Sequence, residues 1–365
     1  MGFKCGIVGL PNVGKSTLFN ALTQTSTAQA LNYPFCTIEP NVGEVAVPDE
    51  RLFQLGRVAG SKNIIPTRMT FVDIAGLVRG ASNGEGLGNQ FLANIREMDA
   101  IAYVVRCFED KSIPHVQGLI DPVEDSKTVE TELMLADIDS LDTRLTTLMK
   151  KAKSNDLYSK DLVTVINKAL EVLSKGQPAR LTELAKKEIP LFVNLRLLTA
   201  KPVIYVCNVD EASLIRGNKF SEAVQLYASK EEADVIVLSA AIEAEISQLD
   251  TEDQFKFLSD LGVKQPGLDK LITAGYKLLG LLTYFTAGDK EARAWTIPRG
   301  SAAPRAARTI HTDFEKGFIR AEVISYSDFV ELGGEQGART AGKMRIEGKD
   351  YLVKDGDVIL FRFNV

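Results

Sequence analysis

Cysteine, histidine and tryptophan are scarce in this chain, and each shortage narrows what the protein can be. Among 365 residues there are four cysteines, two histidines and one tryptophan. Cys5, Cys36, Cys107 and Cys207 are scattered and form no CxxC pair. They are therefore expected to be reduced core thiols rather than parts of a disulfide framework or a zinc site. Such thiols fit a reducing compartment.

Long apolar runs are also absent. No stretch approaches the about 18 apolar residues of a membrane-spanning helix, and the first residues lack the charge and hydropathy pattern of a secretory signal. We therefore expect no membrane span and a cytoplasmic location. Apolar residues make up 45% and charged residues 25%, which is ordinary for a globular protein with a sizeable core. A length of 365 residues predicts two or three domains.

Negative charge predominates slightly overall, but one segment is basic. The net charge is −5, whereas residues 144–201 hold 12 basic residues against 5 acidic ones. Clustered lysines and arginines gain free energy by displacing counterions from phosphate backbones. This segment is therefore a candidate contact for RNA or the ribosome, through Lys150, Lys151, Lys153 and Lys160. The alternative is a solvated helical surface, and no base-reading pattern is visible, so no reading of DNA sequence is expected.

Short apolar runs alternate with helix-length stretches over much of the chain. They span residues 3–10, 69–74, 100–107, 201–207 and 235–239. The first run is followed by a Gly-rich turn and by Ser16 to Leu22 with helical spacing. Strands that alternate with helices predict a mainly parallel sheet covered on both faces, since parallel strands need crossover connections.

The segment 124–200 has no strand pattern. Apolar residues recur at steps of three and four, first at Ile138, Leu141, Leu145, Leu148 and Ala152 and then at Leu162, Ile166, Ala169 and Leu173. These seams predict an inserted antiparallel helical hairpin, a short coiled coil, with residues 150–160 at its tip and residues 176–178 interrupting the return arm.

The last part of the chain, from about residue 281, changes to short strands and Gly-rich turns, with a short helix expected near 304–309. It predicts a compact α+β domain. The predicted organisation is a nucleotide-binding α/β domain made of residues 1–123 and 201–280, an inserted hairpin of residues 124–200, and a C-terminal domain of residues 281–365.

The residues from Gly9 to Ser16 match GxxxxGK[ST] and lie between a predicted strand and a predicted helix, as a phosphate-binding P-loop requires. Its glycines let the backbone wrap closely around phosphates, and the helix N-terminus faces them. Lys15 would neutralise the β- and γ-phosphates, and the Ser16 hydroxyl would ligate Mg²⁺. The expected phosphate-binding residues are Asn12, Val13, Gly14, Lys15, Ser16 and Thr17.

Further candidates for the phosphates and the metal follow in order along the chain. Asp73 ends the next predicted strand in a DxxG sequence, where a carboxylate would hold Mg²⁺ through water and the Gly76 N–H would sense the γ-phosphate. Thr37 lies in a loop between the two motifs and is the candidate second hydroxyl ligand, although a loop threonine is often only a turn residue.

The hydrolytic residue is less clear from the sequence. Ras-like switches carry a glutamine directly after DxxG that orients the attacking water, but Leu77 stands there in this chain and cannot bind water. Intrinsic hydrolysis is therefore expected to be slow or to use another group. His115, in the loop of residues 114–118, is the candidate catalytic residue; the alternative is a solvated loop histidine.

The residues expected to recognise the base differ from the motif found in guanine-specific proteins. After the strand that ends at Cys207 comes Asn208-Val209-Asp210-Glu211, where guanine-specific proteins have Asn-Lys-x-Asp. The extra methylene of Glu211 displaces the carboxylate by about 1.5 Å and weakens the guanine contact. Adenine would donate its amine to the Asn208 oxygen and pack on Val209, so ATP is favoured, with GTP as the alternative. Ser239 opens the expected last base-side loop.

These elements in this order, with Leu77, the helical insertion and the C-terminal domain, resemble the Obg-related translational GTPases. Asn-Val-Asp-Glu is similar to the YchF subfamily, whose members are described as ribosome-binding ATPases, and the resemblance covers essentially the whole chain. Residues 295–300, 310–314 and 317–319 resemble the TGS domain, a ubiquitin-like β-grasp module shared with threonyl-tRNA synthetases and stringent-response enzymes.

The resemblance carries its own expectations. It implies a Ras-like P-loop fold, phosphate binding by Asn12 to Thr17, Mg²⁺ ligation by Ser16 and Thr37, a base pocket at Asn208 and Val209, and a catalytic His115. It implies contact with the ribosome, expected at the large subunit, or with RNA through the hairpin and the TGS domain. In some relatives without the glutamine, an asparagine at the position of Asn12 helps to bind potassium, and the sequence leaves potassium open here.

Three functions compete at this point. A switch ATPase, whose Mg²⁺-nucleotide state sets the loops around Thr37 and Gly76, is favoured. A P-loop kinase for a small molecule would need an arginine-bearing lid and an acceptor pocket, whereas this chain adds a basic hairpin and a TGS-like module. An RNA-binding scaffold that retains nucleotide without hydrolysis is the third.

Overall fold

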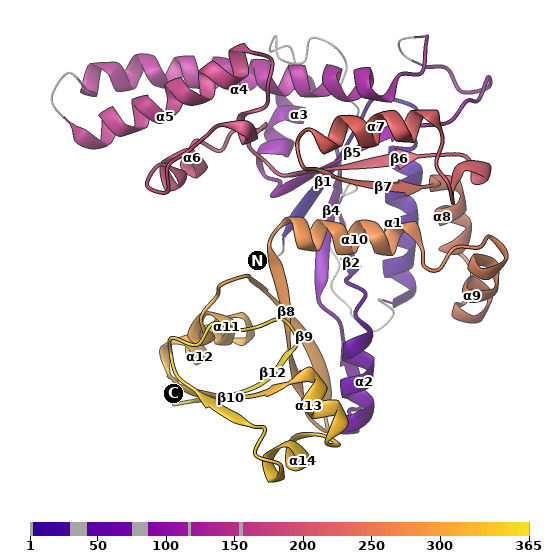
Figure 1. Ribbon diagram of the computed structural model, residues 1–365, viewed down its shortest axis with the longest axis vertical. Helices are drawn as coiled ribbons and strands as arrows, with labels where there is room; N and C mark the ends of the chain where they lie inside the picture. The colour runs from indigo at the N-terminus through magenta and orange to yellow at the C-terminus, as the bar shows by residue number, and fades with distance from the viewer. Residues whose placement is uncertain (1–2, 30–41, 75–86, 116–117, 153–155, 365) are drawn as a thin grey trace. The chain divides into compact units, whose positions relative to one another are not determined.

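The computed structural model describes residues 3–29, 42–74, 87–115, 118–152 and 156–364 (Figure 1). The chain divides into two compact units. Unit 1 consists of Met1–Val45 and Thr70–Leu271, and unit 2 consists of Ala46–Met69 and Ile272–Val365.

Unit 1 is built on a six-stranded sheet with the order β2-β4-β1-β5-β6-β7. The strands are β1 (Lys4–Val8), β2 (Val42–Ala46), β4 (Arg68–Asp73), β5 (Ala100–Arg106), β6 (Val203–Asn208) and β7 (Asp234–Leu238). β1 pairs in parallel with β4 and β5, and β6 pairs in parallel with β5 and β7. Every residue of β5 and β6 is buried, as expected for parallel strands covered on both faces. The five apolar runs of the sequence all form strands here, which confirms the predicted α/β fold.

Helices follow these strands along the chain (Figure 1). They are α1 (Lys15–Gln29), α3 (Leu87–Arg96), α7 (Lys219–Ser229), α8 (Ala240–Ile246), α9 (Thr251–Asp260) and α10 (Gly267–Leu278), whose last residues belong to unit 2. Local sequence fixes several of their starts. The Asn218 side chain accepts from the N–H groups of Phe220 and Ser221, and the Asp250 side chain caps α9 in the same way.

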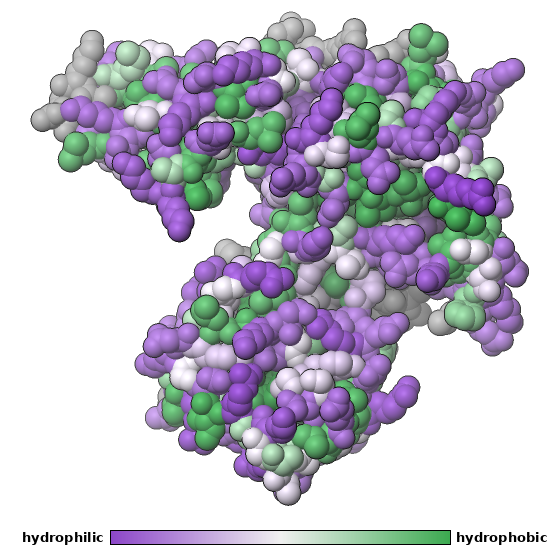
Figure 2. All heavy atoms as spheres, viewed as in Figure 1, coloured by the Kyte–Doolittle hydropathy of each residue, from purple (hydrophilic) through white to green (hydrophobic). Residues whose placement is uncertain are grey.

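The predicted helical hairpin is present in unit 1. It consists of α4 (Pro122–Ala152) and α5 (Leu157–Ser174), followed by the short helices η2 (Ala179–Leu181) and α6 (Ile189–Leu195). Of the side chains predicted as seams, Leu141, Ile166, Ala169 and Leu173 belong to one buried cluster, and Ile138, Leu145, Leu148 and Leu162 pack against it partly buried. The side chain of Ala152 lies outside the described ones. α5 ends just before Gly176, which adopts a φ of 69°, a value that favours glycine. On the face drawn in Figure 2, hydrophilic side chains predominate over the hairpin.

Unit 2 contains a second six-stranded sheet, with the order β11-β10-β12-β8-β9-β3. Its strands are β3 (Asn63–Ile65), β8 (Leu281–Ala287), β9 (Glu291–Pro298), β10 (Phe318–Ser325), β11 (Arg345–Glu347) and β12 (Asp357–Phe363). β8 pairs antiparallel with β9, β10 pairs antiparallel with β11 and β12, and β8 and β12 are parallel. The sheet is therefore mixed.

Helices cover both faces of this sheet. α11 (Ala303–Ile310) and α12 (Thr312–Lys316) belong to one face, and α2 (Glu50–Ala59), α13 (Tyr326–Glu331) and α14 (Glu335–Thr340) to the other. Neighbouring strand residues alternate between two cores: Tyr284 packs with the residues of α11, and Phe285 packs with Leu52 and Leu55 of α2. α11 is the short helix expected near residues 304–309.

Residues 46–69 differ from the predicted domain boundaries, which assigned them to the nucleotide-binding domain. In the structure they belong to unit 2. β3 adds to the edge of the second sheet beside β9, and Arg51 donates to Asp355 at 2.7 Å. Both partners lie more than 200 residues away in the sequence, so local patterns do not reveal them. Among the described helices, none has the length and hydropathy needed to cross a lipid bilayer.

Candidate nucleotide-binding site

The Gly-rich loop lies between β1 and α1 and is shaped by close backbone contacts. A Cβ at Gly9 would come within 2.3 Å of the Val104 carbonyl oxygen, and one at Gly14 within 2.2 Å of Asn208 Nδ2. Gly14 also adopts a φ of 98°. Two of the glycines that define the motif are therefore required by their surroundings.

The N-terminus of α1 has the features of an anion-binding site. α1 begins at Lys15, so the N–H groups of Lys15, Ser16 and Thr17 belong to the first turn, where an α-helix has no internal acceptor for them. The first turn contains no acidic side chain that would neutralise the positive end of the helix dipole. Phosphate groups are the ligands that such a helix start binds readily.

Lys15, Ser16 and Asp73 form a polar cluster at the ends of β1 and β4. Lys15 is 8% exposed, and its Nζ donates to the Leu10 carbonyl at 3.2 Å. Burial lowers the pKa of Lys15, and the negative charge of Asp73 opposes this change. Burial raises the pKa of Asp73, and Lys15 and a hydrogen bond with Ser16 oppose that change. The attraction between Lys15 and Asp73 therefore offsets part of the cost of burying each charge.

The cluster fits a divalent cation. Asp73 Oδ1 is buried and has no hydrogen-bond partner among the described residues, which is costly unless a ligand or water completes it. Carboxylate and hydroxyl oxygens are the ligands that Mg²⁺ prefers, and Mg²⁺ usually keeps several waters beside one or two protein groups. In the described parts of the chain there is no group of three or more acidic, histidine or cysteine side chains that would cage a metal without a nucleotide.

Asn208, at the end of β6, joins the base side of the site to the phosphate loop. Its Nδ2 donates to the Val13 carbonyl, and its Oδ1 accepts from the Ala240 N–H, both at 2.9 Å. The residue is 5% exposed. The sequence predicts that this oxygen accepts from adenine, but in the structure it accepts from the N–H group at the start of α8. The second Nδ2 hydrogen is the group that remains for a base.

The other base-side residues differ in exposure. Val209 is buried, and its N–H donates to the Leu238 carbonyl, so it does not present the open apolar surface expected from the sequence. Asp210 caps the short helix η3 (Glu211–Ser213) by accepting from the Ser213 N–H at 2.9 Å. Glu211 is exposed, and Ser239 is buried at the N-cap of α8.

The loop that carries His115 is organised by Arg106, a residue that the sequence analysis missed. Arg106 ends β5 and is 1% exposed. Its guanidinium donates to the carbonyl groups of Phe108, Asp110 and Ile113. A buried arginine needs such partners, and here they fix the course of the chain toward His115. The only signal in the sequence is an arginine at the end of an otherwise apolar strand.

His115 is buried against the first turn of α4. Its Nε2 lies 2.9 Å from Asp125 Oδ2, and the side chains are 5% and 3% exposed. Burial raises the pKa of Asp125, and the hydrogen bond with His115 opposes this. Asn12 approaches the same loop, because its Nδ2 donates to the Pro114 carbonyl at 3.2 Å. Asp125 was not singled out in the sequence, where it is one of two acids in the first turn of a helix.

Several predicted site residues are either outside the described residues or away from the cluster around Lys15. Thr37, Gly76 and Lys153 lie outside the described residues, as does the side chain of Lys151. Lys150, in the last turn of α4, and Lys160, in the first turn of α5, are exposed on the hairpin.

Other cations of the basic segment are bound within the protein. Arg180 pairs with Glu130 at 2.5 Å and also with Glu231, and Lys168 pairs with Glu188 at 2.7 Å. The positive charge that the hairpin offers to a partner is therefore smaller than the sequence count of residues 144–201.

Comparisons with known proteins place this site in a family. The family described as 50S ribosome-binding GTPase (MMR_HSR1) matches residues 4–168, and the family YchF-GTPase_C, described as a protein of unknown function, matches residues 281–364. Together with the parallel sheet and the loop geometry, the first match defines a Ras-like P-loop NTPase.

Relatives that match over their full length show which family of P-loop NTPases the chain belongs to. The "Ribosome-binding ATPase YchF" of Haemophilus influenzae is 57% identical and that of Bacillus subtilis 51% identical, each over all of both chains. The solved structure of the Schizosaccharomyces pombe YchF GTPase is 39% identical, has a TM-score of 0.90, and is matched over 99% of this chain and 98% of its own. The chain belongs to the YchF family.

Proposed function

We propose that this chain is a Mg²⁺-dependent ATPase that works as a nucleotide-controlled switch and binds the ribosome. The observation that carries the proposal is the cluster of Lys15, Ser16 and Asp73 at the start of α1, with a buried Asp73 oxygen that has no partner among the described residues. A triphosphate with its metal supplies the negative and positive charges that this cluster requires. Curated relatives of the same length carry the name ribosome-binding ATPase.

Each residue of the cluster has a distinct role in this proposal. The first-turn amides of α1 and the Lys15 ammonium bind the phosphates, and Ser16 and Asp73 hold the metal, Asp73 through water. Mg²⁺, when bound, withdraws charge from the phosphate oxygens. Thr37 as second hydroxyl ligand and Gly76 as γ-phosphate donor complete the proposal. Movement of their loops with nucleotide state is what makes the protein a switch.

A preference for ATP over GTP is part of the proposal. The free Nδ2 hydrogen of Asn208 suits N7, an acceptor that adenine and guanine share, so Asn208 does not discriminate. Guanine recognition needs a carboxylate at the position of Glu211, one methylene shorter. Asp210 does not substitute for it, because its carboxylate caps η3. A site that lacks this acceptor loses the contacts that favour guanine and is left with adenine as the better fit.

Slow hydrolysis follows from two features. Leu77 stands where a water-orienting glutamine is found in Ras-like proteins. His115, the proposed catalytic residue, is paired with Asp125 in this structure. His115 has to leave Asp125 before it reaches a phosphate, and this step limits the rate in the absence of a partner. Potassium near Asn12 is a further proposal, tested by comparing the rates in KCl and NaCl.

The nucleotide proposal is tested by calorimetry and phosphate release on the full chain. We expect Mg²⁺-ATP to bind more tightly than Mg²⁺-GTP and to yield inorganic phosphate without any acceptor. Equal or reversed affinities contradict the base preference. Phosphate transfer to an added small acceptor indicates a kinase instead. Absence of any phosphate release with wild-type protein indicates a scaffold that only retains nucleotide.

Ribosome and RNA contact is proposed through the hairpin and the C-terminal unit, with the large subunit as the expected side and the cytoplasm as the location. Lys150 and Lys160 are exposed near the distal end of the hairpin, in the last turn of α4 and the first turn of α5. The mixed sheet of unit 2, with a helix packed on a β-hairpin, supports the TGS assignment of residues 281–365.

The hairpin contact is tested by charge reversal. Lys150→Glu with Lys160→Glu should weaken co-sedimentation with ribosomes at low salt, since phosphate contacts depend on counterion release. A matched control reverses Lys230 and Lys264, two exposed lysines of unit 1 outside the hairpin. Equal weakening by both pairs means that only net charge matters, and no weakening excludes this surface.

A further inference from the structure

The C-terminal end of α3 is bound by a lysine from a distant part of the chain. Lys201 Nζ donates to the Arg96 carbonyl at 3.1 Å and also to the Met98 carbonyl, in the turn that ends the helix. The last carbonyl groups of an α-helix have no partner within the helix, and a cation there meets the negative end of the helix dipole. α3 is the first described element after the DxxG motif. Lys201 therefore holds the helix that follows the proposed γ-phosphate donor.

The charge of Lys201 is held in a partly buried place. Burial lowers the pKa of Lys201, and the negative charges of Asp99 and Asp137 oppose this change. Among the described residues no carboxylate forms an ion pair with Lys201, so its bound partners are the carbonyl groups at the end of α3. A cation that is withdrawn from water is destabilising when it loses such partners. A shift of the end of α3 away from Lys201 is therefore opposed.

The segment that carries Lys201 is also bound by α4. Residues 198–201 form a turn closed by the Lys201 N–H and the Leu198 carbonyl, and we call it the 198–201 turn. Asp137, near the middle of α4, is 2% exposed. Its Oδ1 accepts from the Leu198 N–H at 2.8 Å, and its Oδ2 accepts from the Thr199 N–H at 2.8 Å and from the Thr199 hydroxyl at 2.7 Å. Three bonds to one buried carboxylate fix the turn on α4.

The returning arm of the hairpin binds the same turn. Thr199 is 1% exposed, and its Oγ1 accepts from the Ala179 N–H at 3.0 Å. Its carbonyl accepts from the Arg180 N–H at 3.1 Å. Thr199 is therefore bound to both arms of the hairpin, and Lys201, two residues later, is bound to α3. The turn leads directly into β6, which ends at Asn208.

These contacts connect α3 to the hairpin more firmly than contacts between neutral groups do. Hydrogen bonds to a charged group are shorter and stronger than those between neutral groups, and a buried charge left without them is destabilising. Lys201 makes two such bonds and Asp137 accepts three. A displacement of the end of α3 therefore costs less free energy when the turn and the hairpin move with it than when they separate.

We propose that the 198–201 turn couples nucleotide state to the helical hairpin, with Lys201 as the residue that follows the C-terminal end of α3. A shift of α3 is passed through Lys201 to the turn, and through Asp137 and Thr199 to both arms. Lys201 and Asp137 are positioning residues, since neither belongs to the residues proposed to bind phosphate or metal. The inference rests on the proposed switch function and names the route by which nucleotide state reaches the proposed ribosome-binding surface.

The test compares ribosome affinity in two nucleotide states. Co-sedimentation of the full chain is measured with Mg²⁺ and a non-hydrolysable ATP analogue, and with Mg²⁺-ADP, for wild type and for Lys201→Met. Methionine keeps an unbranched apolar stem and lacks the ammonium. Coupled sites typically differ by about fivefold or more in affinity. We expect such a ratio in wild type and a ratio within about twofold of one in Lys201→Met, with unchanged affinity for the nucleotides themselves.

The matched control is Lys168→Met. Lys168 pairs with Glu188 at 2.7 Å within the hairpin segment and makes no described contact with α3. This variant should keep the wild-type ratio of affinities. Equal loss of the ratio in both variants means that the stability of the hairpin, rather than this route, determines the effect, and overturns the proposal.

A second measurement needs no ribosome. The amides of Ala179, Arg180, Leu198 and Thr199 donate in the bonds described above, so their hydrogen exchange reports on the turn directly. In wild type their exchange should differ between the two nucleotide states. In Lys201→Met the difference should disappear. A difference of wild-type size in this variant contradicts the route through Lys201.

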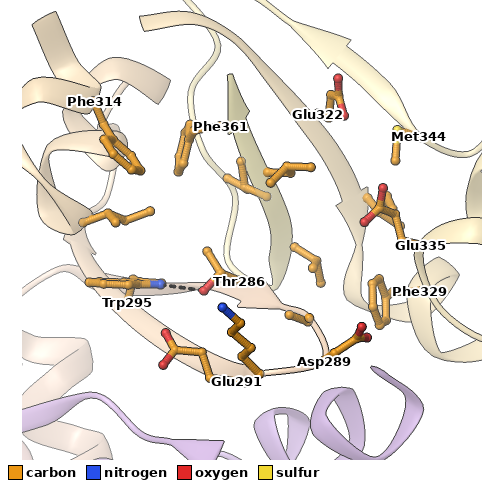
Figure 3. A pocket seen from close by; sticks show the side chains of 18 of the residues that line it. Thr286, Asp289, Glu291, Trp295, Phe314, Glu322, Phe329, Glu335, Met344 and Phe361 are labelled. Carbon is orange, nitrogen blue, oxygen red and sulfur yellow. Dashed lines mark hydrogen bonds between the residues drawn. The ribbon is translucent and has the colours of Figure 1, made fainter. Parts of the chain in front are cut away.

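Folding of the variants is checked in both units. Unchanged nucleotide affinity checks unit 1. Trp295, the only tryptophan of the chain, checks unit 2, where its Nε1 donates to Thr286 Oγ1 at 3.0 Å (Figure 3). An unchanged affinity ratio in folded Lys201→Met overturns the coupling and leaves the switch proposal intact. Equal ribosome affinity of wild type in the two nucleotide states contradicts the switch proposal itself, and the coupling with it.

Discussion

Unit 1 and unit 2 each contain a six-stranded sheet, yet they place their polar groups differently. In unit 1 the central strands β1, β4, β5 and β6 carry charged residues only at their ends, and Asp73, Arg106 and Asn208 come at the carboxyl ends. In unit 2 a charged residue, Glu322, lies in the middle of β10, and β8 and β12 share a single register pair. A parallel sheet gathers chemistry at its carboxyl edge, whereas a mixed sheet offers strand edges.

The largest expected effect is at the carboxyl edge of unit 1. Lys15→Ala removes the ammonium that we propose binds the phosphates and leaves Asp73 without its counter-charge. Phosphate release should fall by about 100-fold or more. Trp295 emission and the unfolding of unit 2 should stay as in wild type. If the variant keeps the wild-type ATPase rate, Lys15 of unit 1 is not needed for hydrolysis, and the contrast drawn between the two sheets is wrong.

The second-largest expected effect is the loss of stability when a glycine with positive φ is replaced by alanine, compared between Gly14 of unit 1 and Gly300 of unit 2. Gly14→Ala puts a methyl group against Asn208 Nδ2 and should cost about 3 kcal/mol of stability together with nucleotide binding. Gly300, with a φ of 82°, has nothing within 4 Å of an added Cβ. Gly300→Ala should therefore cost about 1 kcal/mol through backbone strain alone. Urea unfolding and nucleotide titration of both variants measure the difference, and equal costs contradict it.

Base choice is the third test. Glu211→Asp shortens the exposed side chain to the length found in guanine-specific proteins. The ratio of GTP to ATP affinity should rise by about tenfold, the value of one well-placed charged hydrogen bond. Glu211→Gln keeps the length without the charge and should leave the ratio unchanged. Calorimetry with both nucleotides measures this ratio of affinities. If Glu211→Asp leaves the ratio unchanged, Glu211 does not determine which base is bound.

The smallest effects concern two buried glutamates whose pKa shifts have opposite signs. A hydrogen bond from Arg362 chiefly holds the pKa of Glu322, in unit 2, below its usual value. Its stabilisation is therefore present above about pH 4.3 and is lost as the pH falls through the lowered pKa. Glu322→Gln should cost about 1 kcal/mol at pH 7 and nothing in strong acid, as followed by Trp295 fluorescence.

Burial raises the pKa of Glu243, in unit 1, against the opposing bonds from Gly267 and Leu268. The stability that Glu243 contributes is complete below about pH 4.3 and is lost as the pH rises through the raised pKa. Glu243→Gln should therefore gain stability relative to wild type as the pH rises, the reverse of Glu322→Gln. Circular dichroism against pH measures this trend, and two trends of the same sign contradict the assignment.

Periodicity and spacing predicted what depends on neighbours in sequence. The P-loop, the strands of unit 1 and the hairpin seams all follow from local patterns. The placement of residues 46–69 was missed because their partners in unit 2 are distant in the sequence, and β2 was missed because this short strand is buried only at alternate residues and lacks an apolar run. Asn208 was recognised, but its oxygen was assigned to adenine, since a sequence does not show that Ala240 N–H lies 2.9 Å away. Asp125 was missed for the same reason.

The buried ion pairs of Arg180 have a mechanical consequence for the helical hairpin. Its guanidinium is buried between Glu130 of α4 and Glu231, just after α7, and separating a buried pair costs about 3–5 kcal/mol. These ion pairs therefore brace the root of the hairpin against α7. A load applied at the far end of the arm is delivered to α7, which packs on the strands that lead to Asn208 and Ser239. Pulling or pressing on the arm is thus transmitted toward Asn208 and Ser239, the residues proposed to lie beside the base.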